Sequence, residues 1–224
     1  MKDEEAIRLV KKVFEKIEES ETIENLEKIQ NQLQKTSKNK FYVEKFPEIK
    51  FCLTSADIST LISDGIIDEN FNFTSDFTDA KPITKLFYSI LWKRGDLQKI
   101  KHIIKGISDT EKNEEEAKLL ESQDDALVFY HFGKYLSDKS EQPIIDQHVI
   151  RAFSISCLKG KESESEIDKL RKVKIVNKQL IENYKKWIRD LLIVKKEGED
   201  FAYQIDKVLF ATGKTIKLNA KKSE

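Results

Sequence analysis

DEEAIRLVKKVFEKIEE, residues 3–19, carries its apolar side chains at spacings of three and four. They are Ile7, Val10, Val13, Phe14 and Ile17. This spacing places them on one face of an α-helix, with charged residues on the opposite face. The same period recurs along almost the whole chain, and only seven Gly and three Pro interrupt it. The sequence therefore predicts an all-α protein, a multi-helix globular bundle with at most minor extended segments.

Start and stop signals divide this pattern into helices. Thr22 is expected to cap a helix over residues 22–36, and Ser55 to cap a short one. Residues 82–106 predict two helices that meet at Gly95-Asp96, and both are expected to be buried because they are strongly apolar. Residues 126–136 are apolar nearly all round and predict a central helix, with Asp124 or Asp125 as its cap.

The domain prediction is a single helical domain over residues 1–224, arranged as two lobes. Residues 80–160 form the expected central lobe, and residues 1–79 plus 161–224 the second lobe. A chain of 224 residues is long enough for either one large helical domain or two small lobes.

Charge is balanced overall, because Lys and Arg total 40 and Asp and Glu also total 40. Net charge therefore gives no general argument for nucleic-acid binding, and any such argument depends on local charge. Residues 81–106 hold seven basic residues and one acidic residue, whereas residues 107–147 hold four basic and eleven acidic residues. The acidic stretch 109–121 is expected to be an exposed helix.

Cys52 and Cys157 form no CxxC motif and are expected to be reduced, mostly buried thiols. The charged N-terminus lacks the apolar run of a signal peptide, and no stretch approaches the roughly 20 apolar residues of a membrane helix. We expect a cytoplasmic protein that does not insert into a membrane.

The string Pro143-Ile-Ile-Asp146-Gln-His148-Val-Ile-Arg151-Ala-Phe153 joins a loop to a helix that opens with an Asp. His148 and Arg151 are three residues apart and share a helical face. The string resembles the V-D-T-H-V-x-R segment of the helix-hairpin-helix (HhH-GPD) DNA glycosylase superfamily. The resemblance covers residues 143–153 and extends more loosely over residues 80–160. It implies a two-lobed, glycosylase-like helical fold that binds DNA and hydrolyses an N-glycosidic bond.

The resemblance implies that Asp146 is the catalytic residue, because in that family the aspartate at the helix start is catalytic. A fixed carboxylate opposes the positive charge that develops on the sugar as the bond breaks. The plain alternative is an N-cap, which is worth about 1 kcal/mol to its helix. For His148 the alternative is a surface or half-buried histidine, and for Arg151 it is a salt bridge to a nearby acid.

A second group of candidates gathers in the basic segment, whose lysines and arginine can contact phosphates. Trp92 and Tyr130 are candidates for stacking on bases. The alternative for the segment is a solvated face that balances the acidic stretch. The candidate DNA-binding residues are Lys81, Lys85, Lys93, Arg94, Lys99, Lys101, Lys105, Trp92, Tyr130, His148 and Arg151.

The chain departs from the family at the hairpin, where family glycines let backbone N–H groups approach a phosphate. Residues 121–126 here read ESQDDA, without glycine and with three acids. The lysine of the lyase members has no counterpart there either, so the expected enzyme is a monofunctional glycosylase-like hydrolase. The alternative is a non-catalytic helical binding or scaffold protein that keeps only the fold. A helix-turn-helix regulator built on 82–106 is disfavoured by the expected burial of both helices.

The remaining motifs predict no metal and no cofactor. Three histidines are scattered, and neither HExxH nor GxGxxG occurs. Thr212-Gly-Lys-Thr215 lacks the first glycine of a P-loop, and Gly213 is expected to end the last helix. DNA and a protein are the partners considered, and the sequence leaves the oligomeric state open.

Overall fold

The computed structural model describes residues 3–36, 48–74, 80–110, 126–139, 142–158, 167, 169–170 and 178–218. Within these ranges the regular structure is helical, and the one extended pairing is an isolated antiparallel bridge between Ile67 and Phe73. The predicted all-α fold class is confirmed. The acidic stretch beyond Thr110 and the two proposed caps Asp124 and Asp125 lie outside the described residues.

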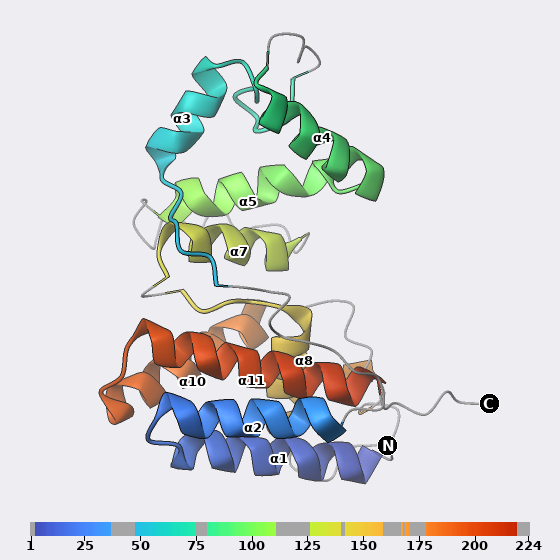
Figure 1. The fold of residues 1–224 in the computed structure, drawn as a ribbon, viewed down its shortest axis with the longest axis vertical. Coiled ribbons are helices and arrows are strands. Elements are labelled where there is room, and N and C mark those ends of the chain that lie inside the picture. The colour runs from blue at the N-terminus through green and yellow to red at the C-terminus, as the bar shows by residue number, and fades with distance from the viewer. Residues whose placement is uncertain are drawn as a thin grey trace, which may run out of the picture. The chain divides into compact units, whose positions relative to one another are not determined.

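The chain divides into two units, shown in Figure 1. Unit 1 consists of Met1–Glu48 and Pro143–Glu224, and unit 2 of Ile49–Gln142. These bounds differ from those of the expected lobes. Residues 143–158 belong with the N- and C-terminal helices because the helix they form packs against both.

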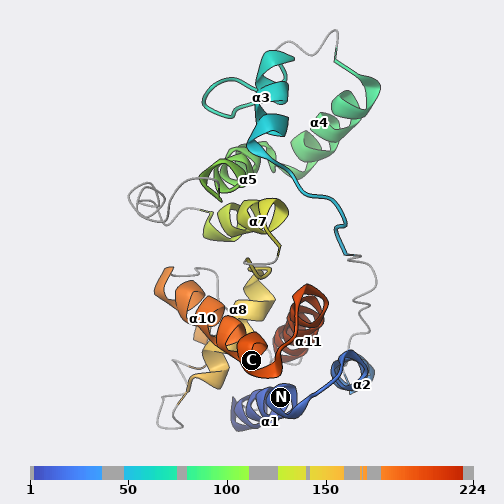
Figure 2. The same cartoon turned by 90° about the vertical axis from the view of Figure 1, so that its left-hand side faces the viewer.

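Unit 1 is built around one short helix that is buried almost completely. Its helices are α1 (Asp3–Glu19), α2 (Ile23–Thr36), α8 (Gln147–Ser156), α10 (Lys178–Lys195) and α11 (Glu199–Leu218). Every residue of α8 from His148 to Ile155 is buried. Helix α11 packs against α8 and α2, and α1 and α10 also contact α8, as Figure 2 lets the reader follow. α8 is therefore the core helix of this unit.

An aromatic cluster joins three of these helices. The ring of Phe14 on α1 lies 5.0 Å from Trp187 on α10, between centroids. Phe153 on α8 lies 5.4 Å from Tyr184 in an edge-on arrangement. Such pairs contribute roughly 0.5–1.5 kcal/mol each beyond their area burial. The periodic apolar face predicted for residues 3–19 is used here, and Val10, Val13, Phe14 and Ile17 are buried.

Unit 2 contains α3 (Ser55–Ser63), α4 (Pro82–Arg94), α5 (Leu97–Thr110) and α7 (Leu127–Ser137). Helices α5 and α7 lie side by side and cross closely at two glycines. A Cβ on Gly106 would lie 2.0 Å from the carbonyl oxygen of Tyr130, and one on Gly133 would lie 2.0 Å from that of Ile103. The backbones therefore touch, which explains why both positions lack side chains.

Two predicted caps have different outcomes. The Thr22 hydroxyl accepts the backbone N–H of Asn25 at 3.3 Å, as expected of an N-cap. The cap of α3 is Thr54 and not Ser55, because Thr54 and Asp57 form a capping box in which each side chain accepts the other's backbone N–H.

Helix α4 begins at Pro82 and ends at Gly95, which has a φ of 70°, as the sequence predicts. Its predicted burial is wrong. No residue of α4 is buried, although Ile104 and Ile107 on α5 are. Apolar spacing shows which side chains share a face, but it does not show that another element covers that face.

Both cysteines are exposed, so their expected burial is also wrong. Cys52 precedes α3, and Cys157 terminates α8. Among the helices in the described part of the chain, none is both long and apolar enough to cross a membrane.

Candidate functional site

Asp146 is the N-cap of α8. Its backbone is extended, with φ −118° and ψ 149°, and its side chain accepts the backbone N–H of His148 at 2.6 Å. Burial raises the pKa of this carboxyl, while the His148 N–H and the positive charge of Arg151 act in the opposite direction. The structure thus gives Asp146 the capping role that was the plain alternative to catalysis.

His148 is buried behind this cap, with 6% of its surface exposed. Its ring meets Phe210 of α11 edge-on at 5.1 Å and contacts the guanidinium of Arg151 through Nδ1. Burial and the positive charges of Arg151 and Lys214 lower the pKa of His148 to about 3. The ring is therefore neutral at neutral pH, and Nδ1 accepts the hydrogen bond from Arg151.

Arg151 is 1% exposed and is among the largest fully buried side chains of the described chain. Burial lowers its pKa, and the nearby carboxylate of Asp146 partly compensates. His148 and Arg151 share a helical face, as the sequence predicts, and Asp146 lies beside them. The three lie inside unit 1, as the polar start of its core helix, and the guanidinium is not open to a phosphate.

On α11, Gly213 packs against the backbone of this cluster at His148. The expectation that Gly213 ends the last helix is wrong, because α11 continues to Leu218. A Cβ at Gly213 would lie 2.0 Å from the carbonyl oxygen of His148. The glycine is present because two helices approach closely, and Thr212-Gly-Lys-Thr215 is helical rather than a phosphate-binding loop.

A second carboxylate, Asp206, lies near this cluster and was missed by the sequence analysis. It is 5% exposed and accepts the backbone N–H of Ile144 at 3.0 Å and the hydroxyl of Tyr184. Burial raises its pKa to about 7, with a further contribution from the charge of Asp146. The available signal was an Asp on the apolar face that Ile205 and Leu209 define in the last helix.

Asp206 ties three segments of unit 1 together. Ile144 belongs to the extended stretch before α8, Tyr184 to α10, and Asp206 to α11. A pKa near neutrality suits acid–base chemistry, but the two donors to this carboxyl, Ile144 and Tyr184, belong to the same core. The arrangement is a buried hydrogen-bond network that joins these three segments.

The other sequence-predicted residues belong to unit 2, whereas Asp146, His148 and Arg151 belong to unit 1. On α4 and just before it, the basic side chains are exposed, and so is Trp92 at 65%. On α5 they are half-buried, and Lys99 pairs with Asp96 and lies over the ring of Phe129. The exposed set is Lys81, Lys85, Lys93 and Arg94, and the half-buried set is Lys99, Lys101 and Lys105.

Tyr130 faces the interior of unit 2 and does not present its ring for stacking on a base. It is 5% exposed, its hydroxyl donates to Asp109 at 3.2 Å, and the ammonium of Lys134 lies over its ring. The buried Asp109 was expected in an exposed acidic helix, so that expectation is wrong for this residue.

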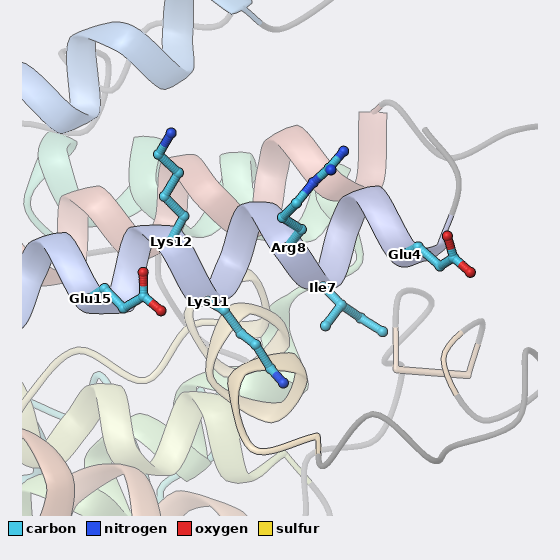
Figure 3. A pocket seen from close by; sticks show the side chains of 6 residues that line it. All are labelled: Glu4, Ile7, Arg8, Lys11, Lys12 and Glu15. Carbon is cyan, nitrogen blue, oxygen red and sulfur yellow. The ribbon is translucent and has the colours of Figure 1, made fainter.

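A hollow of about 590 Å³ lies along α1. Its lining residues come from that one helix and carry both signs of charge. Figure 3 shows the lining side chains fanning away from the helix in different directions rather than converging on a point. A ligand site needs convergent polar groups, so this hollow is a groove between surface side chains. The lining residues are Glu4, Ile7, Arg8, Lys11, Lys12 and Glu15.

The described residues contain no cluster of three or more His, Cys, Asp or Glu side chains that could hold a metal ion. Comparison of the chain with protein-family models, with curated proteins and with solved structures finds no match.

Proposed function

We propose that this protein is a non-catalytic helical binding module that docks a macromolecular partner through one face of α4. This face, the α4 stripe, consists of Ile83, Leu86, Phe87 and Ile90. The observation that carries the proposal is its exposure. These side chains are 70%, 57%, 49% and 50% exposed, respectively.

The spacing of the α4 stripe supports docking. Its members stand at positions i, i+3, i+4 and i+7, the pattern by which one helix anchors itself against an apolar groove or another helix. Single exposed apolar residues are common on protein surfaces, but four that share one helical face form a continuous strip. Such a strip is costly in water and is typical of an interaction site.

An adjacent side of α4 supports the proposal as well, because it is held against unit 2. Tyr88 packs edge-on against Phe73 at 5.3 Å between centroids, and Thr84 and Leu91 are half-buried. A helix held along one side presents the stripe in one orientation, which lowers the ordering cost of binding.

The geometry around Asp146 supports a role without catalysis. One carboxylate oxygen accepts the backbone N–H of His148, the second residue of α8, and the side chains of His148 and Arg151 are buried. These groups stabilise a core helix. Hydrolysis of an N-glycosidic bond by Asp146 stays a prediction, and its assay is given in the Discussion.

The test is photo-crosslinking in cells that naturally make the protein. Benzoylphenylalanine replaces Phe87 in one variant and Trp92 in a matched control. Both residues are exposed aromatics, but on a helix that turns about 100° per residue Trp92 projects away from the stripe. We expect discrete adducts from position 87 that are absent at position 92 and that disappear when Leu86→Glu is added. Equal labelling at both positions, or none at 87, contradicts the proposal.

A further inference from the structure

We infer that the partner of the α4 stripe is an acidic amphipathic helix of another protein, which places its own apolar seam on the stripe and its carboxylates on the surrounding cations. This inference rests on the proposed function. It deepens that function by giving the chemistry of the partner.

The charged residues of α4 and of its N-cap are all basic. No Asp or Glu occurs from Lys81 to Gly95, and the basic side chains there are exposed. Lys93 and Arg94 follow Ile90 at i+3 and i+4, so they stand at the C-terminal end of the stripe. Lys81 stands just before its N-terminal end. Arg94 also pairs with Asp96 at 3.2 Å.

The same placement argues against a second copy of α4 as the occupant. The stripe has basic residues at both ends, so parallel pairing puts like ends together and antiparallel pairing also brings Lys81 toward Lys93 and Arg94. Like charges at close range are destabilising in either arrangement. An acidic helix can pair its carboxylates with these basic residues whether it lies parallel or antiparallel to α4.

A lipid surface fits the geometry less well. An interfacial helix lays its aromatic residues and its apolar face into the same plane of the bilayer. Here Trp92 lies on the opposite side of α4 from the stripe, because it is five residues beyond Phe87 in a helix of about 3.6 residues per turn. The stripe is also narrow, about 100° wide, which matches the seam between two helices.

Nucleic acid fits least well. Contacts to DNA are mostly hydrogen bonds and charge contacts to phosphates and base edges. Four large apolar side chains occupy the centre of this face, and Lys99 of α5 is half-buried over the ring of Phe129. Apolar anchors surrounded by cations match a partner that is apolar along its centre and acidic at its edges.

The closing experiment uses the full chain and named probes, followed by fluorescence anisotropy or liposome flotation. Two synthetic helical peptides share the same Leu at i, i+3, i+4 and i+7, and their flanking positions are all Glu in one and all Lys in the other. Vesicles of phosphatidylcholine and phosphatidylserine and a random DNA duplex are the remaining probes. We expect the Glu peptide to bind about tenfold more tightly than the Lys peptide at low salt, with the difference shrinking as salt rises.

Two double variants distinguish loss of the apolar stripe from a general effect of added negative charge. Leu86→Glu with Ile90→Glu alters the stripe, and Ser89→Glu with Trp92→Glu adds the same charge to exposed positions elsewhere on α4. The first is expected to abolish binding of the Glu peptide, and the second to retain most of it. Circular dichroism confirms that both remain folded, as expected for exposed positions.

The outcomes distinguish the two proposals. Equal binding of the two peptides, lost in the stripe variant, overturns the acidic partner and leaves the docking face intact. Stripe-dependent binding of only the vesicles or only the DNA overturns the acidic partner in favour of that class. If no probe binds in a stripe-dependent way and position 87 also gives no crosslink, the docking function itself fails.

Discussion

The carbonyl oxygen of His148 on α8 lies against the Cα of Gly213 on α11, where a Cβ would come within 2.0 Å of it. Here the polar start of the core helix meets the long C-terminal helix. Helix backbones approach this closely only where one of them lacks a side chain.

Gly213→Ala is therefore expected to destabilise the protein. The added methyl group collides with backbone, which cannot move aside as a flexible side chain can, so the expected loss is about 1–3 kcal/mol in the free energy of unfolding. Urea denaturation measures it. Gly198→Ala is the matched control, because a Cβ there meets nothing within 4 Å. Equal effects of the two changes would show that the close approach is not real.

Asp206 is expected to make stability depend on pH. Its pKa is about 7 in the folded protein against 3.8 for an ordinary Asp, so the folded state keeps a proton that the unfolded state has lost. The contribution is fully present below pH 4 and is lost as pH rises through about 7. Its size is on the order of a few kcal/mol.

Asp206→Asn removes this dependence, because an amide resembles the protonated acid and can still accept from Ile144. We expect the variant to gain stability relative to the natural chain as pH rises from about 4 to about 8. Chemical denaturation across that range checks the prediction, with the exposed Asp190→Asn as control. A constant difference at all pH values is the contrary result.

His148 is expected to make stability depend on pH in the opposite direction. Its pKa is lowered to about 3, so below about 6.5 the unfolded chain takes up a proton that the folded chain does not. This contribution to stability is therefore lost as pH falls from about 6.5 toward 3. NMR of the imidazole tests it directly, because the ring signals are expected to remain those of the neutral form down to about pH 4. The His148→Asn spectrum identifies the signals, and a midpoint above pH 6 contradicts the expectation.

Substitutions of Asp146 distinguish a capping role from a catalytic one. Asn is as good an N-cap as Asp, so Asp146→Asn is expected to leave stability nearly unchanged, whereas Asp146→Ala costs about 1 kcal/mol. A base-release assay on DNA duplexes carrying damaged bases completes the test. We expect no release from the natural chain. Release that disappears in Asp146→Asn while the fold is retained would falsify the non-catalytic proposal and support the glycosylase prediction.

The sequence predicts local structure well where one signal has one physical meaning. Apolar spacing gives the helix over residues 3–19, Thr22 caps the next helix, and Pro82 and Gly95 bound α4. In each case neighbouring residues along the chain decide the outcome. The capping alternative for Asp146 is of the same kind and is what the structure displays.

Predictions that depend on distant partners fare worse. An apolar face is identical in sequence whether it is covered or open, so the exposure of α4 could not be read from its spacing. A glycine late in a helix can end the helix or admit a neighbour, and only the position of His148 shows which applies to Gly213. The burial of Asp206 depends in the same way on Ile144 and Tyr184, which are 62 and 22 residues away.

The two ends of unit 2 are fastened to each other within that unit. The backbone N–H of Leu53 donates to the carbonyl of Leu136 at 2.9 Å, and the ammonium of Lys139 donates to the carbonyl of Ile49. Unit 2 is an insertion in the sequence of unit 1, and these bonds hold the points where the chain enters and leaves unit 2 close together. A short linker that joins two such close points costs little loop-closure entropy. Unit 2, which carries α4, could therefore be replaced by a short linker, or inserted into another protein, as one folded unit.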